Sequence, residues 1–165
     1  MTLIEQLRTY YKGSNIVVDT NLLILLIVGS YNKEQIERFK RTSVFTANDY
    51  DKLNDFLRSF KVVVTPNILT EITNLCDGLN STTDFQFFRH ISQIYPSLEE
   101  ICIGSELVLN ETSFYKFGLT DSLLEYLSKR KVLILTDDLR LYGYLNSLKL
   151  LAINFNHIRS EYLIK

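Results

Sequence analysis

The sequence predicts an α/β protein with a central, mostly parallel sheet that helices cover on both faces. Short, compact apolar runs such as residues 15–18 and 132–135 are typical of buried strands. The segments between these runs carry apolar residues at every third or fourth position, which is the spacing of amphipathic helices. Buried strands that alternate with helices are typical of parallel sheets.

Residues up to 64 supply two of the strands and four of the helices. Asp19 ends the first apolar run, and Asn21 is placed to cap the apolar helix that follows. Asn48 is placed to cap a later helix in the same way. The expected elements are helix 2–11, strand 15–18, helices 21–28, 33–41 and 48–59, and strand 62–64.

The remainder of the chain continues the alternation. Pro66 suits the first turn of a helix, Gly78 ends that helix, and Thr120 is placed to cap a later one. Residues 97–117 carry no clear pattern and are assigned no element. The expected elements are helix 66–77, helix 82–95, helix 120–130, strand 132–135, helix 139–148 and strand 151–155.

Composition limits the classes of protein to consider. The 165 residues fit one domain, residues 1–165, and 46% of them are hydrophobic, which is enough for a sizeable core. With 18 basic and 19 acidic residues, any contact with nucleic acid must come from a local patch. Cys76 and Cys102 lie in apolar surroundings and are expected to be buried free thiols. The apolar run 22–28 is too short to span a membrane, and no basic leader is visible, so we expect a soluble, cytoplasmic protein.

Acidic residues recur where the expected strands end or the helices begin. Asp19 follows a strand, Asp121 opens a helix, and the pair Asp137 and Asp138 follows another strand. Glu71 lies beside the apolar face of its helix, where an unpaired charge is costly. Because gathered carboxylates repel one another, they are tolerated mainly around a cation. The pattern indicates a divalent-metal site and, through it, phosphodiester chemistry.

Each acid also has a simpler interpretation. Asp19 and Asp121 suit helix N-termini, where the helix dipole favours a negative charge. Glu71 can reach water from the edge of its face. One residue of the Asp137–Asp138 pair is expected to face the site while the other caps helix 139–148.

Several neighbouring residues have secondary roles. The Thr136 hydroxyl is placed to orient the acid that binds metal, and Arg140 lies one turn from the aspartate pair, where it can reach a phosphate. The basic clusters 40–41 and 129–131 are either ordinary solvated charge or phosphate contacts. His90 and His157 lack metal-ligand spacing and are expected to be structural.

Four blocks of the chain, in this order, resemble the PIN-domain family. They are residues 18–23 (VDTNLL), 65–72 (TPNILTEI), 118–124 (GLTDSLL) and 135–139 (LTDDL). The resemblance covers about residues 14–155, with a helical insertion at about 30–60 that is longer than in the smallest toxin members.

The family implies a three-layer α/β/α fold and cleavage of RNA with Mg²⁺ or Mn²⁺. The carried-over metal ligands are Asp19, Glu71, Asp121 and either Asp137 or Asp138, with Thr20 or Asn21 orienting a ligand or a phosphate oxygen. Many small bacterial members are toxins of toxin–antitoxin pairs, so an antitoxin protein and a homodimer are the implied partners besides RNA.

Three other functions compete with this hypothesis. A degenerate PIN-like domain would bind RNA or a protein as a scaffold without cutting. A haloacid-dehalogenase-like phosphatase needs a second acid two residues after its nucleophile, where this chain has Asn21. A receiver domain needs a phosphoacceptor aspartate after a middle strand, where this chain has Thr65.

Overall fold

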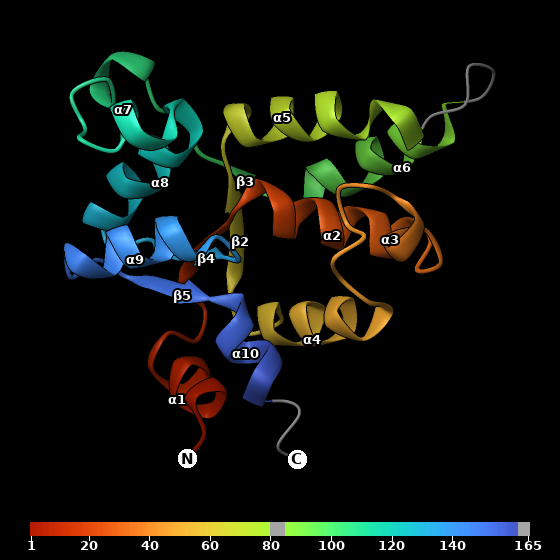
Figure 1. The fold of residues 1–165 in the computed structure, drawn as a ribbon, viewed down its shortest axis with the longest axis horizontal. Coiled ribbons are helices and arrows are strands. Elements are labelled where there is room, and N and C mark those ends of the chain that lie inside the picture. The colour runs from red at the N-terminus through yellow and green to blue at the C-terminus, as the bar shows by residue number, and fades with distance from the viewer. Residues whose placement is uncertain (80–84, 162–165) are drawn as a thin grey trace.

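A five-stranded sheet in which every pair of neighbouring strands is parallel forms the centre of the described part of the protein. The computed structural model describes residues 1–79 and 85–161 (Figure 1). The sheet order is β3-β2-β1-β4-β5. The strands are β1 (Asn15–Val18), β2 (Lys61–Val64), β3 (Glu99–Glu100), β4 (Leu133–Thr136) and β5 (Ala152–Asn154).

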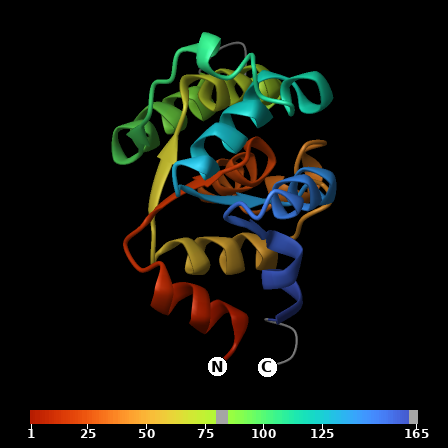
Figure 2. The same ribbon diagram turned by 90° about the vertical axis from the view of Figure 1, so that its left-hand side faces the viewer.

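Helices surround this sheet, an arrangement compatible with a three-layer α/β/α sandwich (Figures 1 and 2). Short 3₁₀ turns lie at Asp77–Leu79, Tyr95–Ser97 and Ser105–Leu107. The helices are α1 (Leu3–Tyr10), α2 (Thr20–Tyr31), α3 (Gln35–Arg38), α4 (Ala47–Leu57), α5 (Pro66–Cys76), α6 (Gln86–Ile94), α7 (Phe114–Phe117), α8 (Leu119–Lys129), α9 (Leu139–Ser147) and α10 (Phe155–Glu161).

The strand order reverses between β1 and β4, which are neighbours in the sheet but distant in the chain. From β1 the chain moves outward through β2 to β3, and it then returns to β4 on the other side of β1. In open parallel sheets, the crevice beyond the carboxyl ends of the strands at such a reversal is the usual ligand site. Asp19 directly follows β1 and Asp137 directly follows β4, so the fold brings these two acids to that crevice.

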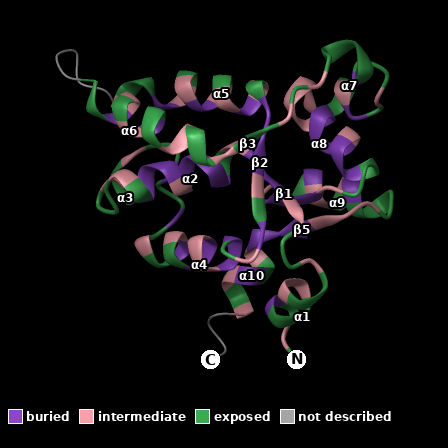
Figure 3. Cartoon of the chain, turned by 180° about the vertical axis from the view of Figure 1, so that it is seen from behind, coloured by how far each residue is buried: buried purple, intermediate pink, exposed green. Residues whose placement is uncertain are grey.

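Helix α2 is the most deeply buried helix and accounts for the apolar run in the sequence. Leu22, Ile24, Leu25 and Val28 are fully buried (Figure 3). A helix that is apolar on all sides must be enclosed by other elements, and α2 packs against α3, α4, α5 and α6. The segment of about 30–60 joins this same core, because Phe56 of α4 is also fully buried.

Several expected element boundaries were wrong. Helix 33–41 is a single turn, Gln35–Arg38, and helix 48–59 is capped by Thr46 rather than by Asn48. The expected start of helix 82–95 falls on residues 82–84, which lie outside the described residues, and α6 begins at Gln86. The unassigned residues 97–117 contain β3 and α7, and the last strand leads directly into α10, which was not expected.

Other expectations concerned cysteines and membranes. Cys76 and Cys102 are both free thiols, but only Cys76 is buried, and the expectation that Cys102 is buried was wrong. Within residues 1–79 and 85–161, no helix combines the length and the apolar character needed to cross a membrane.

Helix α10 is held by an ion pair with α4. Arg159 donates from Nε to Asp49 Oδ1 at 2.9 Å and from a terminal nitrogen to Asp49 Oδ2 at 3.0 Å. Asp49 is 4% exposed and also accepts the main-chain N–H of Thr46, which completes a capping box at the start of α4. The two-point contact therefore joins the end of the described chain to the helical segment after α2.

Candidate functional site

A cavity of about 680 Å³ opens at the reversal point of the sheet. Four carboxylates from four elements lie along its wall, and its described lining contains no lysine or arginine. The wall is therefore strongly negative when these groups are ionised. The acids are Asp19 after β1, Glu71 on α5, Asp121 on α8 and Asp138 after β4.

Asp19 is fixed in place by main-chain donors. It is the N-cap of α2, where its Oδ1 accepts the N–H of Leu22 at 3.0 Å, and its Oδ2 accepts the N–H of Asp137 at 3.0 Å. Asn21 lies near the N-cap as expected, but the cap itself is Asp19 and not Asn21. Asn21 is exposed and its side-chain amide lies 3.5 Å from Asp137 Oδ1.

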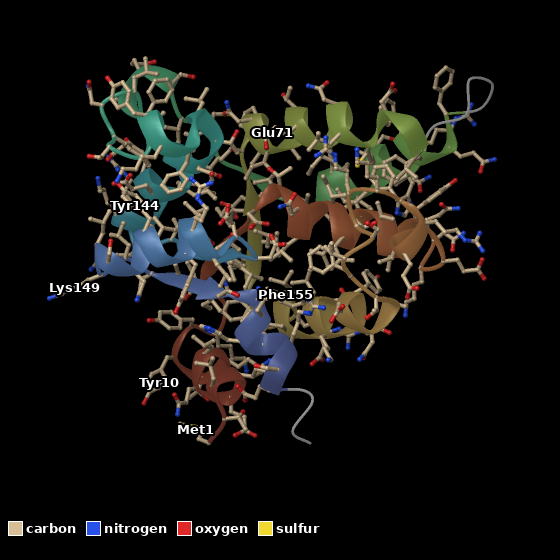
Figure 4. All side chains as sticks on the ribbon, in the orientation of Figure 1. Met1, Tyr10, Glu71, Tyr144, Lys149 and Phe155 are labelled. Atoms are coloured by element: carbon tan, nitrogen blue, oxygen red, sulfur yellow. The ribbon has the colours of Figure 1, made fainter. Side chains whose placement is uncertain are left out.

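Glu71 is held between two threonine hydroxyls. Thr20 Oγ1 donates to Glu71 Oε2 at 2.6 Å, and Thr120 Oγ1 donates to Glu71 Oε1 at 2.6 Å. Figure 4 labels Glu71 on α5, and the bond from Thr20 places its carboxylate toward the start of α2. The simpler interpretation, a glutamate reaching into water, does not describe this carboxylate, because both of its oxygens are engaged.

Thr120 does not cap α8 as the sequence suggested. Gly118 occupies the N-cap position with a φ of 86°, a left-handed conformation that glycine adopts at little cost. The Thr120 hydroxyl is therefore available to Glu71. The sequence carries a signal for this role, because Thr20 adjoins Asp19 and Thr120 adjoins Asp121.

Of the aspartate pair, Asp138 lines the cavity, whereas Asp137 is not among the described lining residues. Asp138 is also the N-cap of α9 and accepts the N–H groups of Arg140 and Leu141. The two roles that the sequence divided between neighbours thus fall on one residue. Thr136 is fully buried, and its Oγ1 accepts the N–H of Asp138 at 3.0 Å.

The acids affect one another electrostatically. Burial, and then the charge of Asp137, raise the pKa of Asp19 from 3.8 to about 7. Burial, followed by the charges of Asp138 and Glu71, raises the pKa of Asp121 to about 6. Burial also raises the pKa of Asp137. Shifts of this kind at a cleft indicate negative charge that lacks a countercharge.

The chemistry of the donor set fits a hard divalent cation. Carboxylate, amide and hydroxyl oxygens are the ligands that Mg²⁺ and Mn²⁺ take. In residues 1–79 and 85–161, however, no three or more His, Cys, Asp or Glu side chains are grouped closely enough to hold a metal ion. Glu71 and Asp138 are instead engaged by threonine hydroxyls and main-chain N–H groups.

The raised pKa of Asp121 predicts how metal-free stability depends on pH. Between about pH 4 and 6 the folded protein holds a proton at Asp121 that the unfolded chain, with a pKa of 3.8, has lost. The contribution of this proton to the stability of the folded state is complete below about pH 4 and disappears as the pH rises through about 6. Asp121→Asn is therefore expected to be about 1–2 kcal/mol more stable than the wild type at pH 8.

Thermal melting in EDTA from pH 4 to pH 8 measures this difference. The melting temperature of Asp121→Asn should exceed that of the wild type by about 2–8 °C at pH 8, and the gap should close near pH 4. Glu37→Gln, an exposed site on α3, is the matched control and should show no such trend. A gap of constant size across this range would contradict the prediction.

The remaining candidates lie away from the cavity lining. His90 Nε2 lies 2.9 Å from the Ser30 hydroxyl, and the His157 ring packs edge-on against Tyr142. In the basic cluster 129–131, Lys129 pairs with Glu125 at 2.9 Å and with Glu111. Sequence reasoning missed Asn67 and Phe117, which also line the cavity.

Comparison of the chain with protein-family models, with curated proteins and with solved structures found no match.

Proposed function

We propose that this protein is a PIN-like, divalent-metal-dependent ribonuclease that hydrolyses RNA phosphodiester bonds. The observation that carries the proposal is the composition of the cavity, with four carboxylates and no described lysine or arginine along its wall. The cavity's place at the reversal point of a parallel sheet supports a ligand site there. The order and spacing of the four sequence blocks support the family and its substrate.

The residues divide into ligands and positioning groups. Asp19, Asp121 and Asp138 line one cavity and would have to draw closer together to hold the cation, which when bound would supply a water of lowered pKa and neutralise charge on the scissile phosphate. Asp19 is kept rigid by its two main-chain donors. Glu71 is held on both oxygens by Thr20 and Thr120, so it keeps one orientation across the cavity.

The finer features implied by the resemblance belong to the same proposal. They are a toxin-like endoribonuclease activity, an antitoxin as protein partner, a homodimer and a cytoplasmic location. The scaffold alternative shares the fold and differs only in lacking chemistry. The phosphatase alternative gains no support, because the residue two positions after Asp19 is Asn21, an exposed amide.

Cleavage of a labelled RNA panel tests the function. Wild-type protein with Mn²⁺ or Mg²⁺ is expected to cut RNA, and the same protein in EDTA is not. Asp19→Asn is purified in parallel, because an asparagine keeps the N-cap of α2 while removing the charge. Cutting that persists in EDTA or in Asp19→Asn would contradict the proposal. Absence of cutting, together with a melting temperature that Mn²⁺ leaves unchanged, would favour the scaffold.

A further inference from the structure

The acidic cavity has an aromatic side chain on its wall that metal binding does not use. Phe117 is the last residue of α7 and lines the cavity beside Asp121. Gly118, with its φ of 86°, turns the chain from α7 directly into α8. Because of this turn, Phe117, which is partly exposed, and Asp121 both line the same cavity.

Two cations lie near this ring, Arg140 over the ring itself and Lys116 over the neighbouring ring of Tyr144. The Arg140 guanidinium lies 5.7 Å from the centroid of the Phe117 ring. Lys116 Nζ lies 5.3 Å from the ring of Tyr144, which itself packs 5.3 Å from Phe117. Neither Arg140 nor Lys116 forms an ion pair within residues 1–79 and 85–161. Their charges are therefore available to an anionic ligand.

The three kinds of group together match the phosphates and the bases of a nucleotide strand. The acids suit a cation next to a phosphate, Arg140 and Lys116 suit neighbouring phosphates, and a partly exposed aromatic side chain suits a base. A base inside a duplex has both of its faces covered by its neighbours, so a stacking site of this kind selects unpaired nucleotides. Arg140 and Lys116 provide the local positive charge that a chain of near-zero net charge needs to bind a polyanion beside an acidic cavity.

We propose that Phe117 is a stacking platform for an unpaired nucleobase next to the scissile phosphate and that Arg140 binds an adjoining phosphate. This inference rests on the proposed nuclease function for the nature of the ligand. It goes beyond that function by naming the residues that select the form of the RNA.

Fluorescence provides a direct test, because the chain contains no tryptophan. Phe117→Trp introduces a single indole at the platform, and Tyr115→Trp introduces one on the same helix at a side chain that is 85% exposed and outside the described cavity lining. Each variant is titrated with a short, unstructured oligouridylate in Ca²⁺, and a gel checks that the RNA stays intact. Quenching is expected for Phe117→Trp and not for Tyr115→Trp.

Equilibrium binding provides the second readout. Phe117→Leu keeps an apolar side chain but loses the ring, and its affinity for the single strand should fall about 5- to 100-fold. Tyr115→Leu should bind within about twofold of the wild type, since a solvent-exposed ring outside the cavity contributes no stacking. Arg140→Gln should reduce the slope of log affinity against log salt by about 0.7, the value for one phosphate contact to a single strand. A matching RNA duplex should bind the wild type less tightly than the single strand.

The possible results separate this inference from the nuclease function. Quenching in Phe117→Trp together with loss of affinity in Phe117→Leu supports the platform. If the wild type then binds the single strand but cuts no RNA, only the nuclease proposal fails. Metal-dependent cutting without quenching, or with unchanged affinity in Phe117→Leu, overturns the platform and leaves the nuclease proposal in place. Failure of the wild type to bind the single strand also overturns it.

Discussion

Asp138→Asn is expected to fold normally and to lose metal-dependent RNA cleavage by at least about a hundredfold, more than the loss of an outer-shell partner usually costs. Asparagine caps helices as well as aspartate does, so the N-cap that Asp138 provides for α9 is retained. The negative charge that faces the cavity is removed. Cleavage rates at saturating Mn²⁺ measure the effect on chemistry, and the rise in melting temperature with Mn²⁺ measures the effect on metal binding.

The neighbouring residue is the matched control for this variant. Asp137 is not among the described lining residues of the cavity, and its N–H, which contacts Asp19, is unchanged in Asp137→Asn. Asp137→Asn is expected to cut within about tenfold of the wild type, the mild end for an outer-shell group. It should also keep the rise in melting temperature with Mn²⁺. A larger loss of cleavage in Asp137→Asn than in Asp138→Asn would contradict this prediction and would make Asp137 the metal ligand of the pair.

Asp49→Ala is expected to destabilise the protein by about 2–3 kcal/mol and to lower its melting temperature by about 5–10 °C. The change removes the capping box of α4, worth about 1 kcal/mol. It also leaves the Arg159 guanidinium, about one-third exposed, without its carboxylate partner. The remaining solvent exposure of Arg159 keeps the loss below the value for a fully buried pair. Urea unfolding and thermal melting measure the change.

Asp51→Ala, on the same helix, is the control for Asp49→Ala. Asp51 pairs with Lys33 at 2.6 Å, but both side chains are at least half exposed. Exposed pairs contribute about 0–1 kcal/mol, so Asp51→Ala should change stability by less than about 1 kcal/mol. Equal losses in the two variants would mean that the contact with Arg159 does not hold α10 in place.

Local patterns in the sequence were sufficient to predict the class of fold. The alternation of apolar runs with helical segments predicted a parallel sheet, and the sheet in the structure is parallel throughout. Placement of acids after strands predicted that Asp19 and the pair Asp137–Asp138 would share one edge of the sheet, and Asp19 and Asp138 line the cavity there. These predictions succeeded because they depend on the spacing of residues within single elements.

Features decided by distant contacts were not predictable in this way. Three consecutive residues are good capping residues, namely Asp19, Thr20 and Asn21. Of these, Asp19 is the cap, and its second carboxylate oxygen accepts the N–H of Asp137, 118 residues away at the end of β4. Helix α10 follows β5 without a turn signal and is held by Asp49, 110 residues away. In residues 97–117, Glu111 is held by Lys129, outside the segment itself.

The central position of β1 has a consequence for how the protein is made. Its partner β4 is translated more than a hundred residues later, which at ordinary ribosome speeds is a delay of about 6–24 seconds. Late in that delay the nascent chain carries Asp19, Glu71 and Asp121 but still lacks the strand that positions Asp19 against Asp137. A product truncated before β4 therefore lacks both Asp138 and the N–H that holds Asp19, so the acidic cavity cannot assemble in it.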